Sequence, residues 1–294
     1  MTKGFKIGAV PAGLKKTGAL DLGLIYSESE AAVAGVFTTN QVQAAPVILT
    51  RERVKAGSCR AIVVNSGNAN CCTGSQGMAD ARASARMAAE ALKIPEASVL
   101  VASTGVIGKH MDMDAVEYAI PKLAAGLSFD GWADLAQAIM TTDTVPKVVS
   151  REIHIGDQVC TITGVAKGAG MIRPDMATML CFVCTDAGAS PETLMKTLKT
   201  ANDGSFNRIT IDGDTSTNDM VLLMANGAAG VDIDEAEAGE SFQTVLNEVL
   251  TTLAKMIVRD GEGATKFVEI RVNGANSDID ARKVADTVAN SSLV

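Results

Sequence analysis

Aromatic side chains and histidines are scarce in this chain of 294 residues. Aromatic residues make up only 3% of it, so a hydrophobic core must be built from Ala, Val, Leu, Ile and Met. The two histidines, His110 and His154, fall in a polar loop and a predicted hairpin, and no G-x-S-x-G motif accompanies them. Both are expected at the surface, so a hydrolase or transferase here would need a base other than histidine.

Several other features are missing, and each excludes a class of protein. The chain has a net charge of −8 and no basic block, which argues against nucleic-acid binding. Its central apolar run, Met179–Cys184, is far shorter than the roughly 20 residues of a membrane span. Six cysteines without a secretion signal indicate a reducing, cytoplasmic setting. Cys181 and Cys184 have C-x-x-C spacing, but without a second pair we expect a buried strand.

Metal and nucleotide motifs are also incomplete. The acidic segment 212–219 suggests a calcium loop, but an EF-hand needs Gly and Glu where this chain has Thr217 and Leu223. The segment either orients a polar substrate or a catalytic turn, or it forms a simple Asx-turn loop. Lys167 precedes a glycine-rich stretch that lacks the phosphate-binding G-x-x-x-x-G-K-[ST] frame. We therefore expect no metal site and no nucleotide site.

Apolar runs of strand type alternate with helical patterns along the chain, which predicts an α/β or α+β fold. Strands are expected at 60–64, 98–102, 148–155, 159–162, 176–183, 207–211, 221–224 and 267–272. Helices are expected at 76–92, at 132–140 with Asp130 as N-cap, at 191–201 with Ser190 as N-cap, at 241–258 and at 277–289.

The most informative segment is 167–180, in which a glycine-rich stretch and a Pro-Asp turn lead into an apolar strand opened by Thr178. By spacing alone, Thr178 is simply a β-branched strand residue. However, the pattern Lys-Gly-Ala-Gly-Met-Ile-x-Pro-x-Met-Ala-Thr-Met-Leu closely resembles the self-cleavage segment of the glutamate N-acetyltransferase family, also called ornithine acetyltransferase. Further stretches that resemble the family are 35–40, 63–70, 102–108, 140–144, 207–219 and 256–266.

The resemblance implies a layered αββα sandwich of the self-processing N-terminal-nucleophile type. In that family the chain breaks between the residues matching Ala177 and Thr178, which would give an α chain of 1–177 and a β chain of 178–294. Thr178 would be the nucleophile. Its new α-amino group, with an ordinary pKa of about 7.7–8.0, would act as the base in place of histidine.

Other site residues follow from the same resemblance. Thr104 and Gly105 match the oxyanion hole, and Thr141 or Thr142, Lys167, Thr178 and Glu262 match positions that contact the amino-acid substrate. From their charges, we expect Lys167 to pair with a substrate carboxylate and Glu262 with a substrate ammonium.

The implied reaction is a ping-pong transfer of acetyl from N-acetylornithine to glutamate through an acetyl-threonine ester, without a metal or organic cofactor. Whether acetyl-CoA also serves as a substrate stays open. Relatives form α2β2 assemblies and extend past the position matching Val294, so we expect a β chain truncated at its C-terminus. The alternatives are a self-processing aminopeptidase or amidase of related fold, and an inactive truncated remnant.

Overall fold

The computed structural model describes residues 2–173, 179–291 and 293, and its elements alternate between strands and helices as the sequence predicts. The strands are β1 (Phe5–Val10), β2 (Leu22–Phe37), β3 (Ser58–Asn68), β4 (Val99–Val106), β5 (Lys147–Ile155), β6 (Gln158–Lys167), β7 (Leu180–Thr185) and β8 (Met220–Ala225). The helices are α1 (Ala45–Val54), α2 (Gly74–Leu92), α3 (Met113–Ala125), α4 (Trp132–Ala138), α5 (Pro191–Gly204), α6 (Ala236–Arg259) and α7 (Asp278–Ala289). Short 3-10 turns lie at Glu96–Ser98 and Phe206–Arg208.

One long strand, β2, joins two halves of a single hydrogen-bonded sheet. The strand order is β4-β3-β2-β8-β7-β6-β5, and β1 pairs with the first part of β2. The pairing of β2 with β3 shifts register between Tyr26 and Ala31, and beyond this irregularity β2 pairs with β8. Such a bulge bends a strand. β2 therefore belongs to both halves of the sheet.

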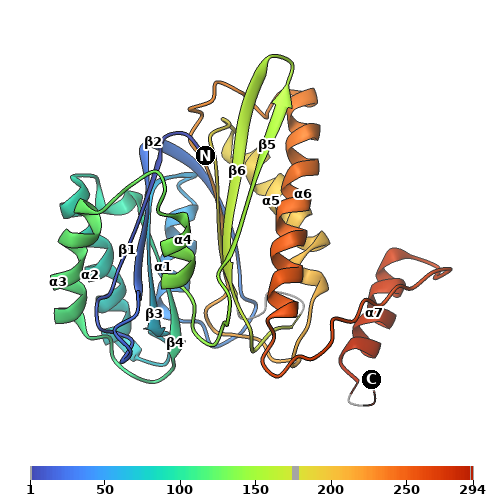
Figure 1. Ribbon diagram of the computed structural model, residues 1–294, viewed down its shortest axis with the longest axis horizontal. Coiled ribbons are helices and arrows are strands. Elements are labelled where there is room, and N and C mark those ends of the chain that lie inside the picture. The colour runs from blue at the N-terminus through green and yellow to red at the C-terminus, as the bar shows by residue number, and fades with distance from the viewer. Residues whose placement is uncertain (1, 174–178, 292, 294) are drawn as a thin grey trace.

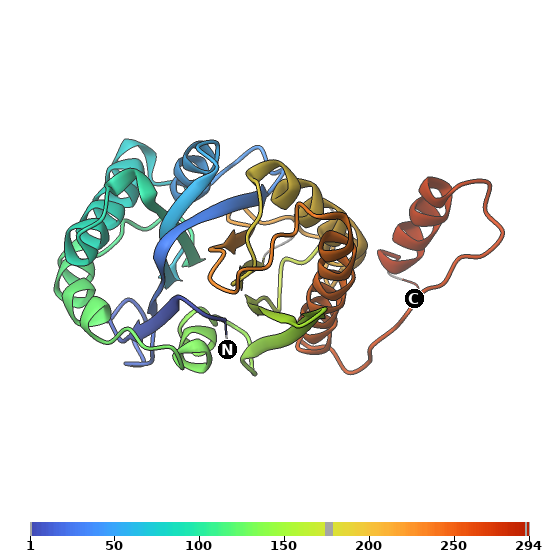
Figure 2. The same ribbon diagram turned by 90° about the horizontal axis from the view of Figure 1, so that it is seen from above.

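The bend produces four layers in the order α, β, β, α (Figures 1 and 2). Residues of β1–β4 pack against α2 and α3 in one core, and residues of β5–β8 pack against α5 and α6 in another. A third core lies between the two halves of the sheet, where Ile7 and Ile62 share a cluster with Phe182 and Leu222. The expected αββα sandwich is confirmed, and its inner core uses mostly aliphatic side chains.

Local sequence signals explain several element boundaries. Helix α5 begins after Ser190, whose hydroxyl accepts a hydrogen bond from the Thr193 amide at 3.3 Å, and Pro191 occupies the first turn. The β5–β6 hairpin turns at Gly156, which has φ of +56°. The helices expected at 76–92, 191–201, 241–258 and 277–289 are confirmed as α2, α5, α6 and α7, with shifted ends.

Other predictions were wrong or incomplete. Segment 207–211 is a 3-10 turn followed by irregular chain. Segment 267–272 is irregular because none of the described strands pairs with it, and Val268 is 62% exposed. The N-cap of α4 is Gly131 rather than Asp130. Strands β3, β4 and β6 extend past their predicted ends at 64, 102 and 162 into glycine-containing segments, because neighbouring strands supply hydrogen-bond partners there. Of the strand expected at 176–183, positions 176–178 lie outside the described residues.

Helix α7 lies apart from the four layers (Figures 1 and 2). None of its residues is buried, and Ile279 and Val284 are 68% and 49% exposed. Contacts to the body include a hydrogen bond from Arg282 Nη2 to the carbonyl oxygen of Asn207 at 3.1 Å. Among the described helices, none combines the length and the hydropathy that crossing a membrane requires.

Candidate active site

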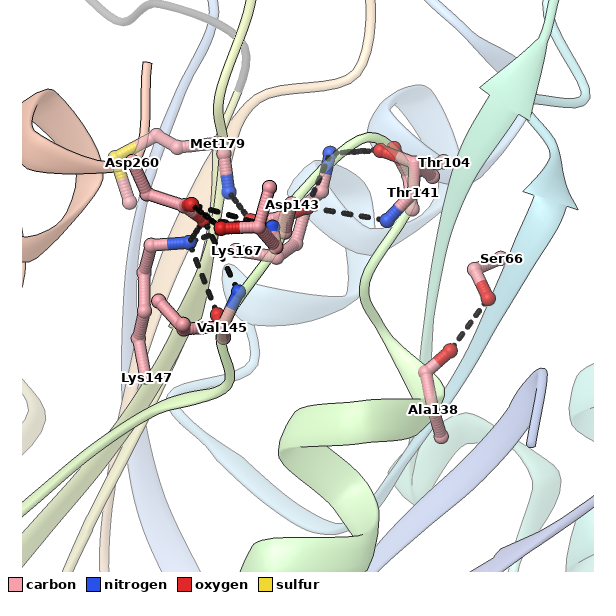
Figure 3. Close-up of polar contacts among 12 residues, drawn as sticks. Ser66, Thr104, Ala138, Thr141, Asp143, Val145, Lys147, Lys167, Met179 and Asp260 are labelled. Atoms are coloured by element: carbon pink, nitrogen blue, oxygen red, sulfur yellow. Dashed lines mark hydrogen bonds and ion pairs between the residues drawn. The ribbon is translucent and has the colours of Figure 1, made fainter. Parts of the chain in front are cut away.

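Lys167, the last residue of β6, lies at the centre of a buried polar cluster (Figure 3). Its Nζ donates to Thr141 Oγ1 at 2.7 Å and lies 3.4 Å from Thr104 Oγ1 in β4. The side chain is 3% exposed, and its ammonium is 3.8 Å from Asp143 Oδ2. Strand β6 therefore brings together two of the predicted site segments, 104–105 and 141–142, which are far apart in the sequence.

The charge of Lys167 is tuned by its surroundings. Burial lowers its pKa below the ordinary value, and the positive charge of Lys147 acts in the same direction. The negative charges of Asp143, Asp219 and Glu262 oppose this shift. A substrate carboxylate beside Lys167 would favour the charged ammonium in the same way.

A second lysine, Lys147, belongs to this cluster and pairs with two of its carboxylates. Its side chain is fully buried, and its Nζ contacts Asp143 Oδ1 at 2.8 Å and Asp260 Oδ2 at 2.6 Å. Asp143 also accepts hydrogen bonds from the amides of Thr141, at 3.0 Å, and Gly168, at 2.6 Å. Burial alone would raise the pKa of Asp143, but the two lysines and the Gly168 amide hold it below the ordinary value. This network therefore fixes the backbone at Thr141 and at Gly168, next to Lys167.

The sheet requires glycine where β3 and β4 approach each other beside Thr104. Gly67 and Gly105 are register partners in this parallel pair, with φ of +94° and +135°. A Cβ on Gly105 would lie 2.5 Å from the backbone nitrogen of Asn68, which no side chain tolerates. Thr104 is buried and Gly105 is exposed, so the backbone at this pair faces the solvent. Such a backbone is suited to contact a substrate closely.

Strand β7 begins next to the cluster. Leu180 pairs with Lys167 across the β6–β7 ladder, and the Met179 amide donates to Asp219 Oδ1 at 2.8 Å. The predicted cleavage residues, Ala177 and Thr178, lie outside the described residues. Their sequence neighbour Met179 is buried, so the described chain resumes inside the site.

Asp219 is a buried carboxyl. In the sequence it appears only as one member of the acidic segment 212–219. Its Oδ2 atom has no hydrogen-bond partner of normal geometry among the described residues. Burial raises its pKa well above the ordinary value. The Met179 amide, the Ser216 hydroxyl and the charge of Lys167 lower the pKa, but by less than burial raises it. This carboxyl can therefore hold a proton at a pH where an exposed aspartate is ionised.

Of the roles that the sequence left open for the 212–219 loop, the structure shows the Asx turn. Asp212 Oδ1 accepts from the Asp214 amide at 3.1 Å in an Asx turn, and from the Ile172 amide at 2.9 Å. Asn218 Nδ2 donates to the carbonyl oxygens of Ala69, at 2.7 Å, and Ser103, at 2.8 Å. The loop thus ties the chain ahead of residue 174 to strand β4. In the part of the chain that the structure describes, no group of three His, Cys, Asp or Glu side chains could hold a metal ion.

The remaining predicted positions differ in how closely they join the cluster. Glu262 is exposed, but its amide donates to the carbonyl oxygen of Ala169 at 2.7 Å, and its charge acts on Lys167. Both candidate threonines are exposed, and Thr141 contacts Lys167 through its hydroxyl. The histidines His110 and His154 are exposed, as predicted.

The sequence reasoning did not single out Asp143, Lys147, Asp219 and Asp260. Asp143, Asp219 and Asp260 fall within stretches that carry the family resemblance, but their spacing gives no sign that they meet. They converge because strands from distant parts of the sequence end at one edge of the sandwich.

Two comparisons define the class and then the family of this protein. The L-aminopeptidase D-Ala-esterase/amidase of Ochrobactrum anthropi, described as a variant of the Ntn hydrolase fold, superposes with a TM-score of 0.52 over 89% of this chain and 85% of its own, at 14% identity. That likeness shows the fold alone, which is a layered αββα sandwich similar to the Ntn hydrolase fold.

The family is shown by sequence. Residues 6–294 match the ArgJ family. The arginine biosynthesis bifunctional protein ArgJ of Geobacter sulfurreducens is 55% identical over 99% of this chain and 75% of its own length. The ArgJ protein of Syntrophotalea carbinolica is also 55% identical, over 99% of this chain and 74% of its own. This chain belongs to the ArgJ family.

Solved structures of the family agree. The ArgJ protein of Bacillus halodurans is 41% identical with a TM-score of 0.56, over 60% of this chain and 92% of that chain. The ornithine acetyltransferase of Mycobacterium tuberculosis, solved with ornithine, is also 41% identical, with a TM-score of 0.54 over 59% of this chain and 92% of its own.

Proposed function

We propose that this protein is a self-cleaving acetyltransferase of arginine biosynthesis, which moves acetyl from N-acetylornithine to glutamate through an ester on Thr178. The observation that carries the proposal is the position of the Lys167 ammonium, which contacts the hydroxyls of Thr141 and Thr104. Lys167 also pairs with Leu180, the first residue of β7. Its relatives are named arginine biosynthesis bifunctional proteins, and one related structure contains ornithine. These names favour the transferase over an aminopeptidase or amidase.

The chemistry needs no histidine. Cleavage before Thr178 exposes an α-amine that takes the proton of the Thr178 hydroxyl as its oxygen attacks the acetyl carbonyl carbon. The amide C–N bond then breaks, and the ornithine nitrogen leaves with that proton. Next, the glutamate amine attacks the ester, its proton returns to the Thr178 oxygen through the α-amine, and N-acetylglutamate departs. No metal or organic cofactor is required, and we expect acetyl-CoA to enter, if it is used, as an alternative acetyl donor.

The other residues have roles that their positions support. Thr104 and Gly105 would donate hydrogen bonds to the oxyanion of each tetrahedral intermediate, and losing one such donor typically costs about 100- to 1000-fold in rate. Lys167 would bind the α-carboxylate of either substrate together with the Thr141 hydroxyl. Glu262 would bind the side-chain ammonium of ornithine, because it is negatively charged and lies near enough to the site for its charge to act on Lys167.

Intact mass spectrometry of the purified protein tests the proposal, with Thr178→Ala as the control. We expect two chains, 1–177 and 178–294, from the wild type and a single chain from the variant. Ornithine release from N-acetylornithine should then accelerate strongly when glutamate is added, since glutamate regenerates the free enzyme. A single wild-type chain, or release that is indifferent to glutamate, would contradict the proposal. Native mass spectrometry of the same sample would test the expected α2β2 assembly.

A further inference from the structure

The site opens into a cleft of about 1010 Å³ whose rim carries an excess of positive charge. Three lysines, Lys15, Lys16 and Lys109, line it, together with two carboxylates, Asp112 and Asp143. Asp143 is already held by Lys147 at 2.8 Å. Since the whole chain has a net charge of −8, this local excess of cations is unlike the rest of the molecule.

Lys15 differs from the other cations of the rim because it is held in place. Its half-buried side chain donates from Nζ to the carbonyl oxygens of Leu20, at 2.9 Å, and Ala138, at 3.3 Å. An ammonium has three donors, so two carbonyl oxygens leave one for a ligand. The described residues place no carboxylate in a salt bridge with Lys15, although Asp21 and Asp143 act on it electrostatically.

The loop that carries Lys15 is also fixed. The carboxylate of Asp21, which is fully buried, accepts hydrogen bonds from the amides of Ala12 at 2.6 Å, Gly13 at 3.1 Å and Lys15 at 2.8 Å. Three bonds to one carboxylate set the backbone of Lys15 relative to β2. The loop therefore presents the ammonium to the cleft with little freedom left to lose on binding.

The cleft connects Lys15 to the active-site cluster. Thr141, which lies 2.7 Å from Lys167, lines the same cleft as Lys15. Burial lowers the pKa of Lys15, the charges of Asp21 and Asp143 oppose this shift, and repulsion by the ammonium of Lys167 acts in the same direction as burial. An anion between them would relieve that repulsion.

The two substrates of the proposed function carry side chains of opposite charge, so they require protein groups of opposite charge in this cleft. N-acetylornithine carries an ammonium on its side chain, and glutamate carries a carboxylate there. Lys167 can serve the α-carboxylate that both possess, and Glu262 can serve the ammonium. The glutamate side chain requires a further cation, and Lys15 is the anchored one.

We propose that Lys15 binds the side-chain carboxylate of the acidic acceptor, and so sets the specificity of the second half of the reaction. This inference rests on the proposed function. It predicts that Lys15→Gln lowers kcat/KM for glutamate by about 10- to 100-fold, the effect of losing a hydrogen bond to a charged group. In a ping-pong reaction kcat/KM for N-acetylornithine reports only the first half, and it should change less than about threefold.

The matched control is Lys16→Gln, which removes a neighbouring cation of the same cleft and loop. It should change both constants by less than about threefold. Lys15→Arg keeps the charge and should retain most of the glutamate activity. With glutamine as the acceptor, Lys15→Gln should cause no further loss, because the side chain of this acceptor carries no charge to pair with Lys15. Equal losses for both substrates, or an unchanged glutamate constant, would overturn the proposal.

Direct binding separates this proposal from the function on which it rests. Isothermal titration calorimetry of glutamate into the wild-type protein involves no turnover, because no acetyl donor is present. Adding Lys15→Gln should raise Kd about 10- to 100-fold, whereas Lys16→Gln should not. Wild-type protein that transfers no acetyl would overturn the proposed function. An affinity for glutamate that is absent, or that is indifferent to Lys15→Gln, would overturn the role of Lys15.

Discussion

Lys147 offers the sharpest test of how the site is built, because its side chain is fully buried between two carboxylates. Replacing it with Met keeps much of the apolar stem and removes the ammonium. Asp143 and Asp260 would then lose their contacts of 2.8 and 2.6 Å and remain as carboxylates without a cation partner at those atoms. The arrangement of the two carboxylates in the site therefore depends on Lys147.

The magnitude follows from the burial. Breaking a buried ion pair by removing one partner costs about 3–5 kcal/mol, because the remaining charge stays desolvated. That is a large part of the roughly 5–15 kcal/mol by which a typical domain is stable. The exposed pair of Arg151 and Glu248, at 2.7 Å, provides the contrast, since a surface ion pair contributes about 0–1 kcal/mol.

The assay is urea unfolding monitored by circular dichroism, carried out in the Thr178→Ala background so that one uncut chain unfolds. Lys147→Met should lose about 3–5 kcal/mol and Arg151→Met less than about 1 kcal/mol. Adding Asp260→Asn to Lys147→Met should recover part of the loss, because one unpaired charge is gone. Equal destabilisation by the two single variants, or no recovery in the double variant, would refute the reasoning.

Two further outcomes follow from backbone geometry and from burial. Gly105→Ala should destabilise the protein by about 3 kcal/mol or more, since its Cβ would lie 2.5 Å from Asn68 N, whereas Gly204→Ala, in open space in α5, should gain up to about 1 kcal/mol. Thermal unfolding distinguishes them, and equal melting temperatures would contradict the close approach. Asp219→Asn keeps an acceptor for the Met179 amide and removes a carboxyl whose pKa burial raises in the folded state. The wild type therefore loses stability relative to this variant as pH rises from about 4 through the raised pKa, and a pH-independent difference would contradict the shift.

Much of the fold could be predicted from the sequence because its signals are local. Ser190 followed by Pro191 favours the start of a helix, and Gly156 allows the turn of a hairpin. Alternation failed at 267–272, since a strand forms only where another strand offers hydrogen bonds. The continuation of β3 and β6 through glycine-containing segments had the opposite cause, because pairing in the sheet outweighed the weak intrinsic preference of those residues.

For the site, the sequence by itself determined the family and with it the candidates Thr104, Lys167 and Glu262. It also predicted that both histidines lie at the surface, and the structure shows them exposed. Only the tertiary structure decided that Thr141 rather than Thr142 contacts Lys167, and that Lys147 joins two carboxylates 113 and 4 residues away. Pairing of this kind depends on which strand ends meet in space. Burial then makes each such contact strong, and neither property is encoded in residue spacing along the chain.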